Sequence, residues 1–549
     1  APDHRSFVGN GGNVEVTVDA GATITTIGDS SAGIIAQSVG GGGGWVATQQ
    51  GAYIGSAGGS GLGYPVSVKV LGAVDARGGN SAGIVVQSTG GADNGGLGSG
   101  DRIVVDIGSA TNSAASVWGG NAGFDMAAAV YFANGGTAAA PNQLNNYGTI
   151  ATHDTTAGTA IFANGAYFEG TNWGSITGNI HVAHGTITNQ GSGTIHTYDA
   201  IDLGGGNFDN LGTLDLTGGV AETRLTGDYT GAAGSRIVFG ADFLAGTSDR
   251  LLISGAAVVG SALTFSPTTL VPGTLNVLTA GGPLSLSGEG SLDATPVFQF
   301  TPRIDGDSIL VTSSAEFATE SLNDDQASLA GHLQRIWDGD NPGALAHAFA
   351  ALATVSDQPG YIEALDMMTT RQVGAIATAR IDANRAFVAN MNSCPVFVGE
   401  SLLMEEASCV WARGIAGRLQ SSGNGGAAGF DADATTIQIG GQFEAWDNVF
   451  VAASLGQEAS NLISASGASA ADGNAWMGGV GLKYQSGPLL ASAMLDFGTG
   501  SFDTSRRIVL GSDDFTARGT ADATNAGFHG RVSYQLPYQG FYLRPSLDL

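Results

Sequence analysis

The sequence predicts a mainly β protein with three parts: an N-terminal right-handed β-solenoid, a short α-helical connector and a C-terminal outer-membrane β-barrel. Three observations predict this fold class. Short glycine-rich repeats recur near the N-terminus, and glycine makes up 89 of the 549 residues. Apolar residues then recur at helical spacing, and after residue 408 apolar and polar residues alternate along strands. We expect domains at 1–228 (repeats), 229–315 (cap), 316–393 (helices) and 394–549 (barrel).

Composition excludes several classes of protein. The formal net charge of −28 argues against a nucleic-acid partner, because phosphate binding needs a cationic face. The hydrophobic fraction of 43% argues against disorder. No run of about 18 apolar residues predicts a transmembrane helix, and any secretion signal is expected upstream of Ala1. The sequence contains neither calcium-loop motifs nor a cofactor motif, so no metal and no cofactor is predicted.

The first repeat predicts the solenoid. Residues 26–44 and 73–96 share the core S-A-G-I-[IV]-x-Q-S-x-G-G, and 117–136 contain an eroded third copy, with Gly123 aligned to Gly83. Each unit consists of a turn, a short strand and a turn. Such a unit is too small to bury its own apolar face, so it must stack on a neighbour.

A second repeat, N-x-G-[TS]-[IL], places an asparagine at each turn; its copies lie at 145–152, 172–180 and 210–218. Asparagine tolerates the left-handed conformation, and its amide can stack along a coil. We therefore expect left-handed turn asparagines that form a ladder. From 229 to 315 the strands become denser and are expected to cap the solenoid and cover its open edge.

The connector is expected to be helical. Apolar spacing over 316–337 and 342–355 predicts short amphipathic helices. A further helix is expected from about Tyr361 to Asn392. It carries three arginines among small residues, namely Arg371, Arg380 and Arg385. A slim helix of this kind suits a narrow polar pore lined with acids, and an ordinary solvated surface helix is the alternative.

Seven barrel strands are predicted, at 408–419, 433–446, 448–457, 474–485, 488–498, 524–536 and 540–549. Within them apolar residues such as Ile437 and Ile439 alternate with polar residues such as Gln438, as lipid outside and water inside require. The connections alternate between long and short, which is typical of outer-membrane barrels and not of soluble sandwiches. Because a single-chain barrel closes with an even number of strands, we expect the chain to hold only part of one.

The only cysteines, Cys394 and Cys409, lie close together in the sequence. A metal site built from two cysteines alone is a weak hypothesis, whereas a local disulfide suits an oxidising compartment. Trp411 and Arg413 are expected to begin the first barrel strand.

Several motifs resemble catalytic or binding sites. Residues 79–83 match G-x-S-x-G, but the hydrolase motif needs a strand-to-helix turn and here the serine recurs in a repeat. His181 and His184 have a spacing unsuited to one face of a strand, so structural or solvated roles are expected. Five scattered aromatic residues either form a glycan-contacting stripe or pack in the core and cap: Trp45, Tyr53, Trp118, Tyr131 and Trp173. No catalytic residue is predicted.

With these features in hand, the sequence resembles the autotransporters, the type V secretion proteins of Gram-negative bacteria, of the large Gly-rich repetitive type. The repeats GIIAQSVGGGGG and GIVVQSTGG resemble their passenger repeats. The stretch GDYTGAAGSRIVF…SDRLLISGAAVVGSALTF resembles the autochaperone segment that precedes the barrel. The most specific feature is Cys394 together with C-V-W-A-R at 409–413, which resembles the start of the first barrel strand after the linker helix.

The resemblance implies a twelve-stranded barrel, of which about seven strands are present, in outer-membrane lipid and inserted by the barrel-assembly machinery. It also implies a passenger at the cell surface or released from it. We expect an adhesin or interaction module for host or neighbouring-cell surfaces; the alternative is an enzyme passenger, a protease or esterase, with its catalytic domain upstream of residue 1. Some relatives cut themselves at an Asn-Asn pair in the linker helix, and that cleavage is not expected from the separated Asn384, Asn390 and Asn392.

Overall fold

The computed structural model describes most of the chain: residues 9–40, 45–48, 51–54, 61–90, 100–121, 127–286, 295–339, 341–369, 373–392, 394–397, 404–422, 429–511, 513–538 and 541–549. It consists of two compact units, Ala1–Leu322 with Ala330–Gln358, and Asn323–Leu329 with Pro359–Leu549. The connector expected at 316–393 is thus divided between the two units. Arg371 lies outside the described residues.

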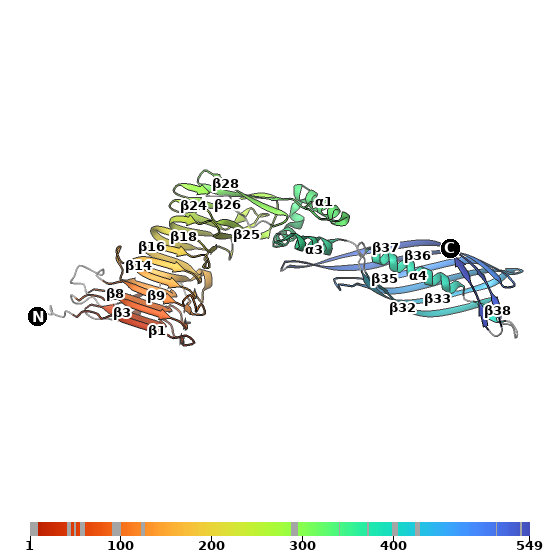
Figure 1. Ribbon diagram of the computed structural model, residues 1–549, viewed down its shortest axis with the longest axis horizontal. Coiled ribbons are helices and arrows are strands. Elements are labelled where there is room, and N and C mark those ends of the chain that lie inside the picture. The colour runs from red at the N-terminus through yellow and green to blue at the C-terminus, as the bar shows by residue number, and fades with distance from the viewer. Residues whose placement is uncertain are drawn as a thin grey trace. The chain divides into compact units, whose positions relative to one another are not determined.

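The first unit is a parallel β-solenoid whose early coils have three strands each (Figure 1). These coils are β1 (Val14–Val18), β2 (Thr23–Thr26) and β3 (Ile34–Val39); β6 (Val66–Val70), β7 (Ala73–Ala76) and β8 (Ile84–Thr89); and β9 (Ile103–Ile107), β10 (Ser116–Gly119) and β11 (Val130–Asn134). Each strand pairs in parallel with its equivalent in the next coil. An insertion in the first coil carries the hairpin β4 (Trp45–Thr48) and β5 (Gly51–Ile54).

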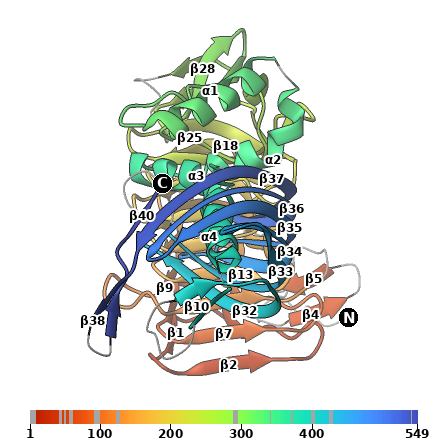
Figure 2. The ribbon, with the colours of Figure 1, turned by 90° about the vertical axis from the view of Figure 1, so that its right-hand side faces the viewer.

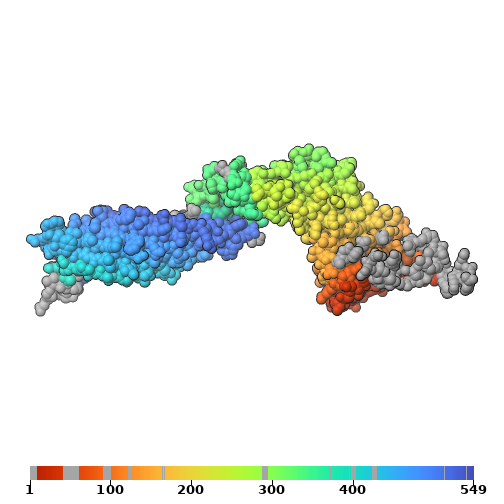
Figure 3. All heavy atoms as spheres, turned by 180° about the vertical axis from the view of Figure 1, so that it is seen from behind, coloured from red at the N-terminus to blue at the C-terminus, as the bar shows by residue number. Residues whose placement is uncertain are grey.

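Later coils merge the third strand of one turn with the first strand of the next. The merged strands are β14 (Thr159–Asn172), β16 (Asn179–Asn189), β18 (Ala200–Asn210) and β20 (Glu222–Gly231), and they follow β12 (Asn142–Asn146). The second sheet continues through β13 (Thr149–Thr152), β15 (Ser175–Thr177), β17 (Thr194–His196), β19 (Thr213–Asp215) and β21 (Arg236–Asp242). Figure 3 shows these coils as one continuous stack.

The predicted alignment of the third repeat is wrong. Val130 pairs with Ile84, so Ala129 occupies the position of Gly83, and Gly123 lies outside the described residues. Position 83 has no room for a side chain, because a Cβ added to Gly83 would lie 2.6 Å from the carbonyl oxygen of Ala129. The letters N-A-G at 121–123 match the repeat, but the strand that pairs with β8 is the apolar run that follows them, β11.

The solenoid core contains inward-pointing valine, isoleucine and leucine side chains together with a buried asparagine ladder. The Nδ2 atoms of Asn146, Asn172 and Asn189 each donate to the side-chain Oδ1 of the next ladder residue, ending at Asn210, at 2.7, 2.8 and 2.9 Å. The ladder is confirmed, but the left-handed conformation is not: the four residues are absent from the set with positive φ. Each asparagine instead lies at a strand end, and its side-chain amide also donates to the backbone carbonyl of the first residue of a strand in the next coil.

The last coils of the stack are followed by antiparallel strands and helices. Parallel pairing continues through β23 (Arg250–Ile253), β24 (Ala257–Val259), β25 (Ala262–Thr269), β26 (Gly273–Ala280) and β27 (Leu284–Leu286). The antiparallel additions are β22 (Thr247–Ser248), β28 (Phe298–Asp305) and β29 (Ser308–Ala315). Strand β29 pairs antiparallel with both β26 and β28. Phe298, Phe317, Trp337 and Phe349 pack their rings together, with centroids 5.4–6.3 Å apart.

The helices are shorter than predicted, and their bounds differ from the predicted ranges. They are α1 (Asp324–Asp338), a 3-10 turn at Pro342–Leu345, α2 (Ala346–Leu352), α3 (Gln358–Met368) and α4 (Val373–Met391). Helix α1 begins at Asp324 and not near Glu316, because Asn323 and Gln326 bond to each other's backbone N–H in a capping box. The single helix predicted from Tyr361 to Asn392 is two helices. Among the described residues, no helix is long and apolar enough to span a membrane.

The second unit contains a curled antiparallel sheet of seven strands (Figure 2). These are β32 (Cys409–Ser421), β33 (Phe430–Trp446), β34 (Val449–Ser464), β35 (Ser469–Ser486), β36 (Leu489–Leu510), β37 (Asp513–Tyr534) and β40 (Ser546–Asp548). The alternation in β33 is confirmed: Ile437 and Ile439 are 65% and 54% exposed, whereas Gln438 is fully buried.

Two predictions for this sheet are wrong. The stretches 458–473 and 499–523, expected as long loops, are mostly strand, because pairing continues beyond the lipid-facing part where no apolar face is needed. The last strand, expected at 540–549, is divided. Its first part, β39 (Phe541–Leu543), pairs with β38 (Leu536–Tyr538), and only β40 joins the curled sheet. Pro545 separates the two parts and has no N–H to continue a ladder.

Candidate functional site

Helix α4 lies along the inner face of the curled sheet and contacts β33 through β37 (Figure 2). Its side chains meet the wall in successive layers. At its N-terminal end Ala375 and Ile376 pack in an apolar layer with wall residues of β33 to β36, namely Phe430, Ala432, Leu462, Ala471 and Phe502. The first layer therefore surrounds the start of the helix with apolar contacts.

The second layer is polar and charged. The Arg380 Nη1 atom lies 2.5 Å from Glu458 Oε1, and the two side chains are only 3% and 5% exposed. Glu458 Oε2 also accepts a hydrogen bond from the Thr436 hydroxyl. One turn further on, the Asn384 side-chain amide donates to the buried Asp496 carboxylate. The helix thus presents polar groups where the wall carries buried acids.

A second apolar layer follows near the C-terminal end of the helix. Phe387, Val388 and Met391 pack with two wall methionines, Met477 and Met494. Glycines on the inner wall make room for these side chains. A Cβ added at Gly479 would lie 2.8 Å from Met391 Sδ, and one at Gly456 would lie 3.2 Å from the Phe387 ring. Inward-facing glycines in long strands are the sequence feature that could have revealed this contact.

Of the two predicted wall residues at the start of β32, Arg413 bonds to the helix and Trp411 packs against Arg413. Arg413 donates from Nη1 to Asn390 Oδ1 at 3.0 Å, and the Asn390 amide donates to Gln438 Oε1 at the same distance. The Arg413 guanidinium also lies over the Trp411 ring, 5.1 Å from its centroid. Of the three predicted helix arginines, Arg380 is buried in an ion pair and Arg385 is exposed.

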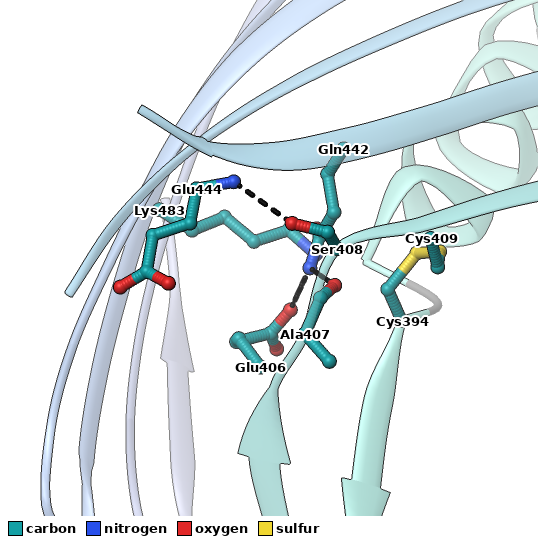
Figure 4. Close-up of a disulfide and its surroundings, with 8 residues drawn as sticks. All are labelled: Cys394, Glu406, Ala407, Ser408, Cys409, Gln442, Glu444 and Lys483. Carbon is teal, nitrogen blue, oxygen red and sulfur yellow. Dashed lines mark hydrogen bonds and ion pairs between the residues drawn. A yellow bond between two sulfur atoms is a disulfide. The ribbon is translucent and has the colours of Figure 1, made fainter. Parts of the chain in front are cut away.

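A disulfide joins Cys394 to Cys409, with Cα atoms 6.0 Å apart (Figure 4). Beside it the Lys483 ammonium lies 3.1 Å from Glu406 Oε2, and both side chains are at most 2% exposed. Gln442 donates to the same carboxylate oxygen at 2.8 Å. Sequence reasoning found the cysteines but missed this cluster, because its members are up to 77 residues apart.

The outer face of the sheet carries a belt of exposed apolar side chains. In β35 this belt includes Val480 and Leu482 and lies between Trp476 and Tyr484, which are 53% and 46% exposed. Eight residues of strand span about 27 Å, or about 20 Å along the membrane normal at the usual barrel tilt. That is close to the height of the apolar band of outer-membrane barrels, and aromatic rings flank it on both sides as in those proteins.

The solenoid motifs have structural roles. Ser81 of the G-x-S-x-G match is fully buried; its Oγ accepts from the Ser31 N–H and donates to the Gly28 carbonyl. His184 stacks on Tyr167, and Trp173 stacks on Tyr147 with centroids 4.4 Å apart. Two further predicted aromatic residues pack on neighbouring coils, Trp118 against His153 and Tyr131 against Phe162. The side chains of Trp45 and Tyr53 lie outside the described part of the chain.

Among the described residues, no group of three or more His, Cys, Asp or Glu side chains is arranged to hold a metal ion. Two buried pairs of ionisable groups lie inside the curled sheet. These pairs, Arg380 with Glu458 and Lys483 with Glu406, position the helix and its connection to the wall.

A curled antiparallel sheet with an apolar outer belt, a polar inner face and a helix along that inner face defines an outer-membrane β-barrel of the secretion type. The family model for the autotransporter beta-domain matches residues 410–549, and this part of the chain is the β-domain of an autotransporter. The β-domain lies in the outer membrane and the passenger is exposed at the surface. Searches among curated proteins and among solved structures each gave no match.

Family membership orients the β-domain. Outer-membrane barrels have short periplasmic turns and longer outer connections. The two-residue turns after Trp446 and Ser486 therefore face the periplasm. The long ends of β36 and β37, which pair up to Leu510 and Asp513, face outward. Family membership also implies insertion by the barrel-assembly machinery. The β-domain is a secretion module and not a catalytic one.

Proposed function

We propose that the passenger is an adhesin or surface-interaction module that binds through an extended face. The support comes from the continuous coil stack. Ten strands pair side by side along one face, in the order β1, β6, β9, β12, β14, β16, β18, β20, β24 and β27. At about 4.8 Å between neighbouring strands, this face is about 43 Å long. A face of this length provides many small contacts with a host or neighbouring-cell surface and needs no deep pocket.

The internal construction of the stack suits a module that stays rigid outside the cell. The buried ladder of Asn146, Asn172, Asn189 and Asn210 ties four successive coils together with hydrogen bonds of 2.7–2.9 Å. At the end of the ladder, Asn210 donates to the hydroxyl of buried Tyr229, which also bonds to Ser261. The polar groups therefore form a chain that continues into the cap.

We also propose that helix α4 is the segment that threads the pore after export. Buried contacts with the wall support this role: Arg380 with Glu458, Asn384 with Asp496 and Phe387 against Gly456. Arg371 and Arg385 are assigned to the same helix segment by the sequence.

The test compares cells that produce the full-length gene product before and after surface protease shaving. Adhesion to host cells and to neighbouring bacteria is measured together with ester and peptide hydrolysis. An adhesin predicts that shaving abolishes adhesion while the β-domain stays in the outer membrane. If hydrolysis and not adhesion disappears with the passenger, the alternative is right: a protease or esterase whose catalytic domain precedes residue 1.

A matched pair of variants sharpens the test. Replacing Trp173 with alanine alters the half-buried corner where its ring stacks on Tyr147, whereas replacing Phe208 alters the buried core. An interaction face that includes the corner predicts that Trp173→Ala reduces adhesion at unchanged surface level. Phe208→Ala should reduce the amount of folded passenger instead.

A further inference from the structure

The segment between helix α4 and the first barrel strand, residues 394–409, is attached to the inner wall at two points. One point is the disulfide between Cys394 and Cys409. The other is a clamp of hydrogen bonds and one ion pair on residues 404–408 (Figure 4). The segment contains the hairpin of β30 (Pro395–Phe397) and β31 (Met404–Glu406), and β31 belongs to the clamped residues.

The clamp uses side chains of two wall strands, β33 and β35, and of Gln535, which directly follows β37. Lys483 of β35 and Gln442 of β33 both hold the Glu406 carboxylate, at 3.1 and 2.8 Å. The backbone of the segment is held as well: the Glu406 N–H donates to Gln485 Oε1, and the Met404 N–H donates to Gln535 Oε1. Residues 404–408 are therefore fixed to the wall without help from the disulfide.

The disulfide limits the distance that the C-terminal end of the helix can move away from the wall. Cys394 and Cys409 are separated by 15 residues, which span about 50 Å when extended. Helix α4 has 19 residues and is therefore about 28 Å long. Without the disulfide, and once the clamp has broken, a pull on the helix could draw it outward by more than its own length before the backbone became taut. With the disulfide, Cys394 stays within 6.0 Å of Cys409, measured between Cα atoms.

We propose that the Cys394–Cys409 disulfide is a mechanical stop that transfers load on the displayed passenger directly to strand β32. Load passes from the passenger through α4 to Cys394 and across the sulfur–sulfur bond to Cys409, where β32 begins. The segment 395–408 and its clamp then carry no load. The proposal rests on helix α4 threading the pore, and it does not depend on what the passenger binds.

The stop is sensitive to redox conditions. A dithiol reductant transfers two electrons and two protons to the disulfide, leaves thiols on Cys394 and Cys409, and becomes a cyclic disulfide itself. After reduction the load path runs through residues 395–408. The clamp of Glu406 on Lys483 then resists extension until it breaks.

The test is single-molecule pulling on the full-length gene product in a supported bilayer, with the handle at the outer end of the passenger. The contour length reached before the barrel itself is disrupted should be about 45 Å greater after treatment with dithiothreitol than before, because 15 residues that span about 50 Å when extended replace a Cα separation of 6.0 Å. The variant Cys394→Ser/Cys409→Ser should give the longer length in both conditions, so it controls for other effects of the reductant.

A second variant tests the clamp. Lys483→Met should lower the force of the additional step under reducing conditions and leave the oxidised trace unchanged. An unchanged contour length in reduced protein whose two thiols are shown to be free would overturn the proposal. If the double-serine variant does not assemble, the contour length of reduced wild-type protein still tests the proposal. Loss of adhesion in the shaving test would leave this length difference unaffected.

Discussion

Replacing Arg380 with methionine is expected to destabilise the packing of helix α4 in the lumen by about 3–5 kcal/mol, because it leaves a buried carboxylate without its cation. The Glu458 side chain is 5% exposed and would keep only the Thr436 hydroxyl, at 3.2 Å, as a hydrogen-bond donor. Replacing both members of the pair with methionine removes the buried charge altogether. Double replacement of this kind is often neutral or stabilising, so we expect it to cost much less than Arg380→Met alone.

The assay is the urea concentration at which the full-length protein in detergent loses the folded, heat-modifiable form on a gel. Arg418→Met is the matched control, because Arg418 pairs with Asp431 at 3.3 Å on the exposed surface. Exposed pairs contribute less than about 1 kcal/mol. The reasoning is refuted if Arg380→Met costs no more than Arg418→Met, or if the double replacement costs as much as Arg380→Met.

Three further predictions concern the ladder, the cap and the lumen wall. Asn172→Ala should lower the free energy of unfolding of the solenoid by about 1–3 kcal/mol because it leaves buried ladder partners unpaired, and Asn145→Ala on the outer face should cost less, as followed by circular dichroism in urea. Burial raises the pKa of Tyr229 to about 12, above about 10 in an unfolded chain; stability should therefore fall as pH rises above 10, and Tyr229→Phe should remove that fall, as measured by urea unfolding from pH 8 to 11. Gly479→Val should displace the end of helix α4 and reduce surface display measured by antibody labelling, whereas Gly414→Val, which meets open space, should not.

Periodicity made the main architecture predictable. Alternation of period two places Ile437 and Ile439 outside and Gln438 inside, because a strand in an outer-membrane wall has lipid on one face and polar lumen on the other. The N-x-G repeat likewise indicated the ladder, since Asn146, Asn172 and Asn210 recur at the same point of their coils. Both patterns are local, and a sequence displays them directly.

The errors arose where local pattern and backbone pairing diverge. Strands β36 and β37 extend far beyond their alternating part, because backbone hydrogen bonds continue after the lipid has ended. The third repeat was aligned on Gly123 because its letters match, while Val130 is the residue that pairs with Ile84. Helix α1 begins only at Asp324, where Asn323 and Gln326 cap each other.

By itself, the sequence determined the order of repeats, helices and barrel strands, and the two cysteines that could pair. Only the tertiary structure decided what lies opposite the helix. Arg380 meets Glu458 across 78 residues, and Lys483 meets Glu406 across 77. Such pairings depend on how far each strand is shifted against its neighbours and how tightly the sheet curls. These quantities follow from the packing of the whole wall and leave no periodic trace in any one segment.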